Sequence, residues 1–304
     1  MSNLINLDHA QEIITSLALN AGDYSKRHLG KTEIQWKDMN LTDLRNAKWY
    51  IARCLTSVDL ACQNIILEGL IQEEFHKKTS VLAEEKTELV SRFNADSDLQ
   101  WVIDPIDGTF NYAMANTNNK QSLEKILNQP LNIDSNIYGI AIGLRKRDEG
   151  FLLSAVYLPI LDSMYVARRG AGAVKNGSKQ AIISACFDSE SKIHLNSKSD
   201  TLKKIFTKYQ QPLCTVYSVT CVADNSCNVF FARDTQLFDA GPASLIVSES
   251  GGYVCDENAN PLEFSRINNE ITVPVYIAGP NKSFNLEIIS HIKKKGSIFH
   301  IDSD

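Results

Sequence analysis

Short apolar runs that end in acidic residues recur along the chain. Residues 101–103 are aromatic or β-branched and predict a buried strand that breaks at Asp104-Pro105. Residues 80–83 predict a second short strand, which ends at the paired acids Glu84-Glu85. The pattern therefore predicts that carboxylates gather where strands end.

Apolar positions at helical spacing predict helices on both sides of these strands. One helix is expected over residues 8–28 with Asp8 as its cap, and a second follows Asp59 over residues 60–71. Asp59 has two possible roles there, as the N-cap or as a first-turn acid. A later helix is expected to start at Asp239 as its N-cap, with Pro242 in its first turn. Further short helices are expected over residues 122–127, 202–209 and 284–293.

The middle of the chain has the alternation typical of strands. Strands are expected over residues 137–144, 151–157, 162–167, 215–219, 227–232 and 273–278, with Asn176-Gly177 as a hairpin turn. Strands and helices that alternate around a meander predict a layered α/β sandwich. Residues 31–50 give no clear assignment. The polar, Asn-rich residues 117–134 read as an inserted loop, either solvated or covering an active site.

The composition is that of an ordinary globular protein. The chain has 304 residues, 43% hydrophobic and 22% charged, and a net charge of −5, which predicts neither a nucleic-acid nor a membrane partner. Seven cysteines without a CxxC pair indicate neither a disulfide framework nor a zinc site. No signal peptide or membrane-spanning run is evident, so we expect a cytoplasmic protein.

The turn after the first strand brings two aspartates together. Pro105 fixes φ and Gly108 permits a tight turn, so Asp104 and Asp107 are expected to lie close to each other. Such carboxylates repel, and either a raised pKa or a hard cation relieves the repulsion. Thr109 is expected to start a helix whose N–H groups suit a phosphate. The alternative is an Asx turn before a capped helix, with both aspartates solvated.

Three motifs together resemble the inositol monophosphatase family of magnesium-dependent, lithium-sensitive sugar phosphatases. They are Glu84-Glu85, then the stretch from Asp104 to Thr109 with Asn111-Tyr112, and then Asp239 opening a helix that runs into Glu249-Ser-Gly-Gly. The resemblance implies a layered αβαβα sandwich of the sugar phosphatase type. It also implies a homodimer, and we expect two closely packed subdomains, residues 1–190 with the metal motifs and residues 191–304.

The resemblance also implies a binding site for two to three Mg²⁺ ions. The implied ligands are Glu84, Asp104, the carbonyl of Ile106, Asp107 and Asp239. Asp104 would bridge two of the ions, whereas Glu85 would lie behind the ligands without touching the metal. Carboxylate and carbonyl oxygens are donors that suit magnesium.

The implied catalytic residues are Thr109, Asp59 and Glu84. Thr109, hydrogen-bonded to Asp59, would orient or deprotonate the attacking water, while Asp107 and the amides of Gly108 and Thr109 would bind the phosphorylated substrate. No covalent phosphoenzyme is expected, because water attacks the phosphate directly.

The expected reaction is hydrolysis of a small phosphorylated polyol or sugar such as an inositol monophosphate. Two departures weaken the case for inositol, because residues 213–221 lack the usual Gly-Ser/Thr-Ala segment and Ala232 stands where an acid is usual. Alternative enzymes are a 3′(2′),5′-bisphosphate nucleotidase, a fructose-1,6-bisphosphatase or a histidinol-phosphatase. A non-enzymatic alternative is a regulatory binding partner of the transcription machinery, against which the complete set of acids argues.

Overall fold

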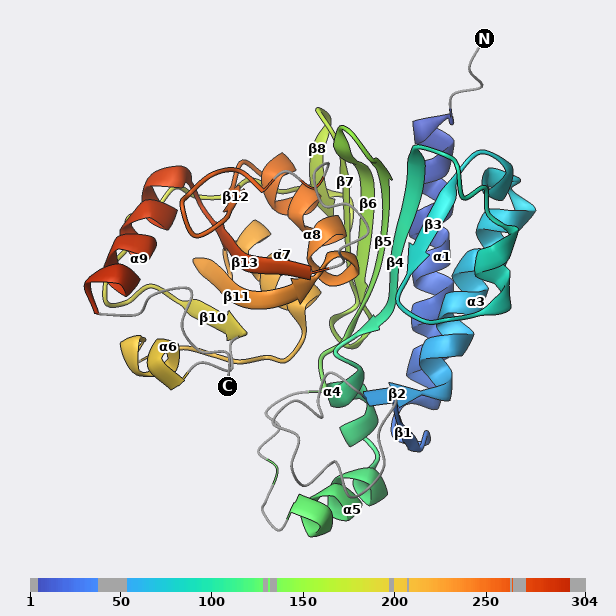
Figure 1. Ribbon diagram of the computed structural model, residues 1–304, viewed down its shortest axis with the longest axis horizontal. Helices are drawn as coiled ribbons and strands as arrows, with labels where there is room; N and C mark the ends of the chain where they lie inside the picture. The colour runs from blue at the N-terminus through green and yellow to red at the C-terminus, as the bar shows by residue number, and fades with distance from the viewer. Residues whose placement is uncertain are drawn as a thin grey trace.

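Helices and sheets alternate in five layers (Figure 1). The computed structural model describes residues 5–37, 54–127, 131, 136–196, 200–206, 208–262, 264 and 272–295. The layers are the helices α1 (Leu7–His28) and α3 (Ser57–Gln72), a large sheet, the helices α7 (Thr215–Ala223) and α8 (Leu237–Glu249), a small sheet, and the helices α6 (Asp200–Ile205) and α9 (Lys282–Lys294). This order confirms the expected layered αβαβα sandwich.

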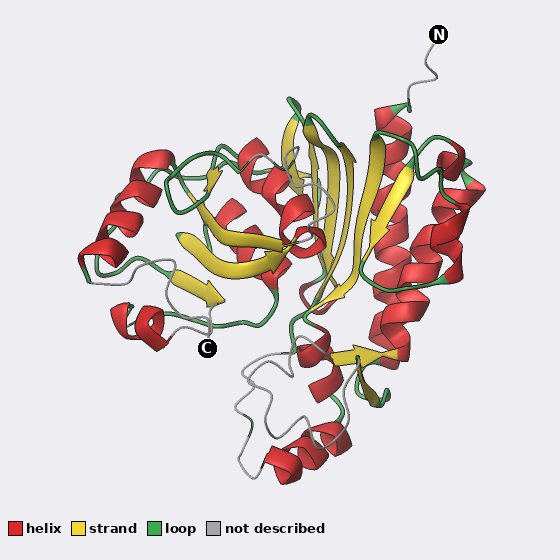
Figure 2. Ribbon diagram, in the orientation of Figure 1, coloured by secondary structure: helices red, strands yellow, loops and turns green. Residues whose placement is uncertain are grey.

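The large sheet has seven strands in the order of the chain (Figure 2). They are β3 (Ser80–Ala83), β4 (Leu99–Asp107), β5 (Gly139–Lys146), β6 (Gly150–Leu158), β7 (Ser163–Arg168), β8 (Gly172–Lys175) and β9 (Ser178–Lys179). β3 and β4 are parallel, so Glu84 and the acids of β4 come to the same edge. The other neighbours are antiparallel.

The small sheet has four strands in the order β10, β11, β13 and β12. They span β10 (Ile193–Asn196), β11 (Val229–Gln236), β13 (Thr272–Gly279) and β12 (Tyr253–Cys255). A separate pair, β1 (Ile34–Trp36) and β2 (Cys54–Thr56), lies beside the short helices α4 (Thr109–Met114) and α5 (Thr117–Leu127). Short 3₁₀ turns follow at Phe75–Lys77, Glu88–Arg92 and Pro159–Leu161.

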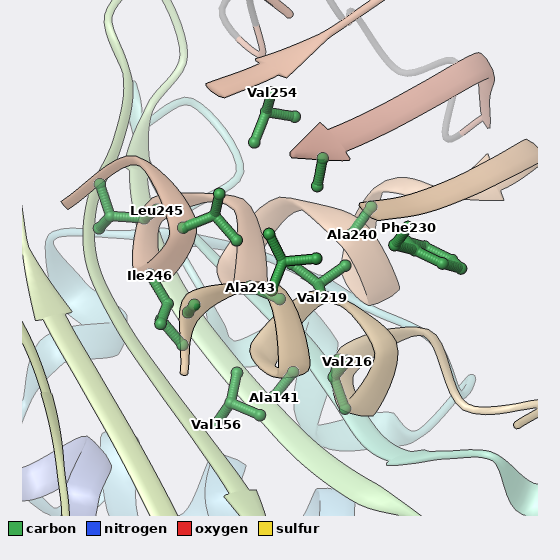
Figure 3. Close-up of a cluster of buried hydrophobic side chains, with 14 of the residues drawn as sticks. Ala141, Val156, Val216, Val219, Phe230, Ala240, Ala243, Leu245, Ile246 and Val254 are labelled. Carbon is green, nitrogen blue, oxygen red and sulfur yellow. The ribbon is translucent and has the colours of Figure 1, made fainter. Parts of the chain in front are cut away.

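The helices α7 and α8 are buried between the two sheets. Figure 3 shows Val216 and Val219 of α7 and Ile246 of α8 among side chains from both sheets. A helix that is apolar on all sides is expected in such a central layer. α8 approaches the large sheet closely, since a Cβ on Gly241 would lie 2.5 Å from the Phe151 ring. This close packing fixes the start of α8, where Asp239 lies.

Several predicted elements need correction. β4 does not break at Asp104-Pro105 but runs to Asp107, because a bulge between Asp104 and Asp107 absorbs the proline that lacks an N–H. α1 is capped by the Asn6 side chain, with Asp8 in the first turn. In the same way Asp239 lies in the first turn of α8, and Gln236 is the N-cap.

The largest error concerns residues 215–219, which form the start of helix α7 instead of a strand. A short buried run rich in valine and threonine has the same apolar pattern in either state, so periodicity could not distinguish the two. The remaining predicted strands and helices are confirmed with shifted ends, although α5 is longer than expected and β12 was not predicted.

Some predictions fall outside the described residues. Of the unassigned stretch 31–50, the structure describes residues 31–37, and of the inserted loop it describes residues 117–127 and 131. No helix in the described part of the chain is long and apolar enough to cross a membrane. The subdomain boundary near residue 190 stays a prediction.

Candidate active site

Three aspartates, two of them buried and the third partly buried, form an acidic cluster between the sheet and helix α8. Asp104 and Asp107 end strand β4, and Asp239 comes from the first turn of α8. One carboxylate oxygen from each residue lies within 4.8 Å of the others. Asp104 is 1% exposed and Asp107 is 8% exposed. We call these three residues the aspartate cluster.

The aspartate cluster is electrostatically strained without a counter-charge. Burial and the neighbouring Glu84 and Asp239 carboxylates raise the pKa of Asp104 well above its ordinary value. Burial also raises the pKa of Asp239 and lifts the pKa of Asp107 to about 6, although hydrogen bonds from α7 oppose the shift in Asp107. Hard, buried, mutually repelling oxygen donors are a donor set that fits a divalent cation such as Mg²⁺. The residues present therefore fit the metal that the sequence implies.

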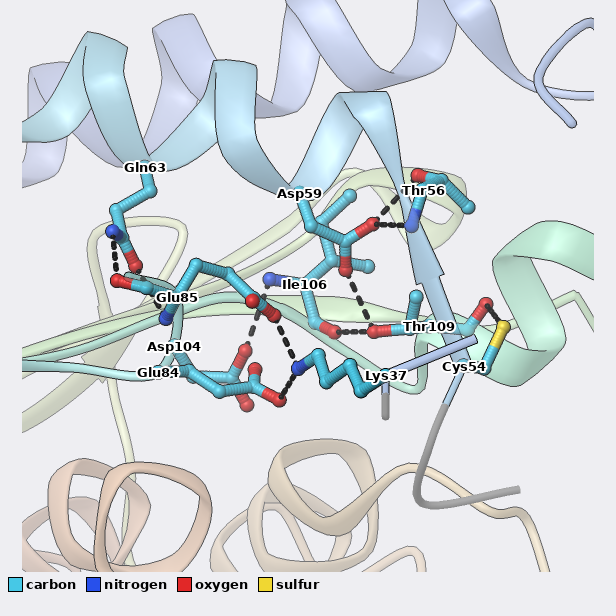
Figure 4. A network of polar contacts seen from close by, with 10 residues as sticks. All are labelled: Lys37, Cys54, Thr56, Asp59, Gln63, Glu84, Glu85, Asp104, Ile106 and Thr109. Atoms are coloured by element: carbon cyan, nitrogen blue, oxygen red, sulfur yellow. Dashed lines mark hydrogen bonds and ion pairs between the residues drawn. The ribbon is translucent and has the colours of Figure 1, made fainter. Parts of the chain in front are cut away.

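A second acidic pair at the site shares a lysine as its counter-ion (Figure 4). The Lys37 ammonium lies 2.9 Å from Oε1 of Glu84 and 2.5 Å from Oε1 of Glu85. Burial opposes the charge on Lys37, but attraction to Glu84 and bonding to Glu85 outweigh it and raise the pKa of Lys37. Sequence reasoning missed Lys37, because it lies 47 residues before Glu84 in a stretch without clear periodicity.

Glu85 is fixed by its main chain as well as by Lys37. The Gln63 side chain of α3 accepts from the Glu85 N–H at 2.9 Å and donates to the Glu85 carbonyl at 2.6 Å. The residue is 5% exposed, and burial raises the pKa of its carboxyl group. These bonds fix Glu85 next to Glu84, and its expected role behind the metal ligands stays a prediction.

Thr109 and Asp59 are joined next to the acidic residues. The Thr109 hydroxyl lies 2.8 Å from Asp59 Oδ1 and 2.8 Å from the Ile106 carbonyl oxygen, so its single hydrogen is shared between two acceptors. The other oxygen of Asp59 accepts from the N–H and hydroxyl of Thr56 at 2.9 and 2.6 Å, which completes a capping box at the start of α3. Burial raises the pKa of Asp59 to about 7. Asp59 is thus both a first-turn acid and a partner of Thr109.

Helix α7 contacts the aspartate cluster directly, which the sequence did not predict. The Val216 N–H donates to Asp107 Oδ2 at 2.6 Å, and the Cys214 thiol lies 3.2 Å from the same oxygen. Cys214 is the N-cap of α7 but forms no side-chain cap of its own. Asp107 therefore caps the helix from another part of the chain. The sequence showed that residues 213–221 lack the segment usual in the family, but it did not show that this region contacts Asp107.

The structure brings the sequence-predicted site residues into one region. Asp59, Glu84, Glu85, Asp104, Ile106 and Thr109 lie together in Figure 4, and Asp104 joins them to Asp107 and Asp239. Gly108, with a φ of +86°, links the acids to α4. The roles of these residues in binding and catalysis stay predictions. Ala232 is fully buried on β11, where it packs between the small sheet and the central helices.

Comparisons with known proteins identify relatives over most of the chain. The family model described as "Inositol monophosphatase family" matches residues 7–296. An inositol monophosphatase of Dictyostelium discoideum is 28% identical over 217 residues, and the Nus factor SuhB of Salmonella typhimurium is 26% identical over 215. Each match covers 66% of this chain and 71% of the relative. The solved IMPase of Thermotoga maritima has a TM-score of 0.71 at 18% identity, covering 93% of this chain and 96% of that one.

Proposed function

Because the chain belongs to the inositol monophosphatase family, a family of metal-dependent phosphatases, we propose that it is a Mg²⁺-dependent phosphomonoesterase acting on a small phosphorylated polyol or sugar. The observation that supports this most is the largely buried aspartate cluster next to the Thr109–Asp59 pair. The site holds four acids, which are Glu84 and the three members of the aspartate cluster. Lys37 forms an ion pair with Glu84, but no Lys or Arg of the described residues forms one with the cluster. The negative charges of the cluster are therefore costly unless a cation binds them.

The residues that would hold the metal divide into two overlapping groups. Glu84, Asp104 and the Ile106 carbonyl would hold one Mg²⁺, and Asp104, Asp107 and Asp239 a second. Bound magnesium would neutralise phosphate charge and lower the pKa of the attacking water. Asp104 belongs to both groups, so the proposal depends on it most.

The chain's own residues would move the proton. Thr109 Oγ1 would accept a hydrogen bond from the attacking water while donating its own hydrogen to Asp59 Oδ1, 2.8 Å away. A pKa of about 7 allows Asp59 to take up a proton near neutral pH. The Thr56 bonds hold the Asp59 carboxylate so that Oδ1 stays turned to Thr109. The two residues would thus act as a relay that removes the proton from water.

The substrate would lie between the start of α4 and the start of α7. Amides of Gly108 and Thr109 would bind the phosphate, and Asp107 would contact the group that carries it. Inositol monophosphate is one candidate, but the segment 213–221 and Ala232 differ from what is usual in relatives that use inositol phosphates. Nucleotide bisphosphates, fructose bisphosphate and histidinol phosphate are therefore included as alternative substrates.

A second candidate function is a non-enzymatic role as a regulatory partner of transcription machinery. It is favoured by the relatives named Nus factor SuhB, which match as well as the inositol monophosphatase of Dictyostelium. The complete set of acids favours the enzyme, because a binding role alone does not need them. By resemblance to the family, the protein would act as a homodimer in the cytoplasm.

The test is phosphate release from a panel of sugar, inositol and nucleotide phosphates, with Mg²⁺ and with chelator. Asp104→Asn serves as the inactive variant, and Asp96→Asn, which changes an exposed acid, serves as the matched control. Mg²⁺-dependent release that only Asp104→Asn loses supports the enzyme, and the preferred compound gives the substrate class. No release by the folded wild-type protein from any compound contradicts it and favours the binding role.

A further inference from the structure

Asn111 is a buried residue of the motif that the mechanism above does not use. It is the third residue of α4 and is 1% exposed. Its side-chain Nδ2 donates to the Ile137 carbonyl at 2.8 Å and to the Pro212 carbonyl at 2.7 Å. Both hydrogens of the amide are therefore used. Asn111 joins α4 to two segments that lie 26 and 101 residues away.

The segment that follows Pro212 leads directly to the aspartate cluster. Leu213 has a φ of +56°, in the left-handed region that is uncommon for a leucine and that persists where the surroundings enforce it. Cys214 follows, and Val216 two residues later donates to Asp107 Oδ2. Only three residues therefore lie between Pro212, whose carbonyl Asn111 holds, and Val216, whose amide holds Asp107.

Gly108 shows how closely these segments approach each other. A Cβ placed on Gly108 would lie 3.1 Å from Cys214 Cβ, 3.2 Å from the Ile137 oxygen and 3.3 Å from the Leu213 oxygen. The two segments that Asn111 binds thus press against the residue between Asp107 and Thr109. A shift of either segment would be transmitted to the turn that carries Asp107.

We propose that Asn111 is a positioning residue that holds the start of α7 against Asp107 and thereby sets the affinity of the aspartate cluster for its metal. α7 occupies Oδ2 of Asp107, which leaves Oδ1 as the oxygen available to a cation. Without the bond from Asn111, the strained turn at Leu213 relaxes and the amide of Val216 moves away. Asp107 then loses the partners that orient it. The inference rests on the metal-dependent function proposed above.

The test compares two substitutions on the same short helix. Asn111→Ser removes both bonds to the distant segments, whereas Tyr112→Phe removes one buried bond, from the Tyr112 hydroxyl to the Ser25 carbonyl at 2.9 Å. Tyr112 is equally buried but contacts α1 instead of α7. Both variants are expected to lose thermal stability in chelator. A merely structural role for Asn111 predicts that neither changes metal affinity.

Mg²⁺ binding is measured by calorimetry without substrate. For Asn111→Ser we expect the dissociation constant to rise about tenfold, as is usual when a residue that orients a metal ligand is lost. For Tyr112→Phe we expect no change. Wild-type affinity in Asn111→Ser, or an equal loss in both variants, would overturn the proposal. If Asn111→Ser does not fold, Asn111→Asp keeps the volume. Its added negative charge favours a cation, so weaker binding supports the proposal and equal or tighter binding contradicts it.

A double variant tests the strained turn. Glycine adopts a positive φ without strain, so Leu213→Gly in the Asn111→Ser background should recover part of the lost affinity. No recovery would show that Asn111 does not act through this turn. The calorimetric readout also separates this inference from the phosphatase assay. A wild-type protein that binds Mg²⁺ but releases no phosphate contradicts the function and leaves the test of Asn111 valid.

Discussion

The acidic site has two halves that differ in whether a cationic side chain pairs with their carboxylates. On one side, Lys37 lies between the carboxylates of Glu84 and Glu85. On the other side, the aspartate cluster has no ion pair with a Lys or Arg of the described residues, and its members have raised pKa values. In one half, Lys37 offsets one of the two negative charges, whereas in the other half no such ion pair offsets the repulsion among the aspartates.

This difference indicates where a cation is needed most. A pair of acids with an internal lysine is stable without metal, and a metal that binds Glu84 has to compete with the ammonium of Lys37. The aspartate cluster gains more from a cation, because binding restores the charged form of groups that burial holds partly protonated. The predictions below test this contrast, from the largest expected effect to the smallest.

The largest effect is expected from the aspartate that would bridge both ions. Asp104→Asn should lower the rate of phosphate release roughly a thousandfold or more, because bound metal contributes several kcal/mol to the transition state. The metal-free variant should be at least as stable as the wild type, since one of the repelling charges is removed. Release assays and thermal unfolding in chelator measure the two effects. Retention of wild-type activity would remove Asp104 from the mechanism.

The next largest effect is expected at Lys37, which pairs with Glu84 and Glu85. Lys37→Met should tighten Mg²⁺ binding by roughly tenfold, because a positive charge a few ångströms from the cation is lost. It should also destabilise the metal-free protein, since Glu84 and Glu85 lose their counter-charge. Lys31→Met, which changes an exposed lysine in the turn after α1, is the control. Weaker metal binding in Lys37→Met would show that Lys37 supports the loaded site instead of competing with the metal.

The stability of the metal-free protein should fall as the pH rises. Asp59 and Asp107, with pKa values of about 7 and about 6, keep their protons in the folded state after the unfolded chain has lost them near pH 4. The unfolded state is therefore favoured progressively between about pH 4 and pH 7. We expect the melting temperature in chelator to drop by roughly 5 °C or more over this range.

Mg²⁺ should flatten that pH profile. A bound cation stabilises the charged carboxylates, so the melting temperature near pH 7 should rise on addition of metal much more than it does near pH 5. Thermal unfolding at a series of pH values, with chelator and with Mg²⁺, is the measurement. A metal-free melting temperature that rises from pH 5 to pH 7 contradicts the raised pKa values.

The closeness of Asp104 and Asp107 could be predicted from their local spacing, whereas the resemblance to the family added Glu84 and Asp239. Asp104, Asp107 and Gly108 are close in the chain, and the parallel pairing of β3 with β4 brings Glu84 to the same edge of the sheet. The layered fold could be predicted for a similar reason, since most elements have a clear apolar period. These features depend on neighbours in the sequence or on adjacent strands.

The contacts that complete the site could not be predicted, because they join distant segments. Lys37 reaches Glu84 from a stretch without a clear period, and Asn111 reaches Pro212 across 101 residues. Helix α7 was predicted as a strand because its valines and threonines favour strands, and its N-terminus is stabilised by Asp107 instead of its own cap. Tertiary contacts, not local preference, determine this part of the site.

The smallest effect is expected at Glu85, the second member of the Glu84–Glu85 pair. Glu85→Gln keeps the shape of the side chain and the main-chain bonds to Gln63, and it removes one of the two charges that hold Lys37. We expect activity to fall less than about tenfold, because a residue that only supports a ligand affects metal binding indirectly. Glu84→Gln, measured in parallel, should cost far more if Glu84 is a ligand. Equal losses of activity in the two variants would show that both acids bind metal. Glu85 would then be a metal ligand instead of a residue that only supports Glu84.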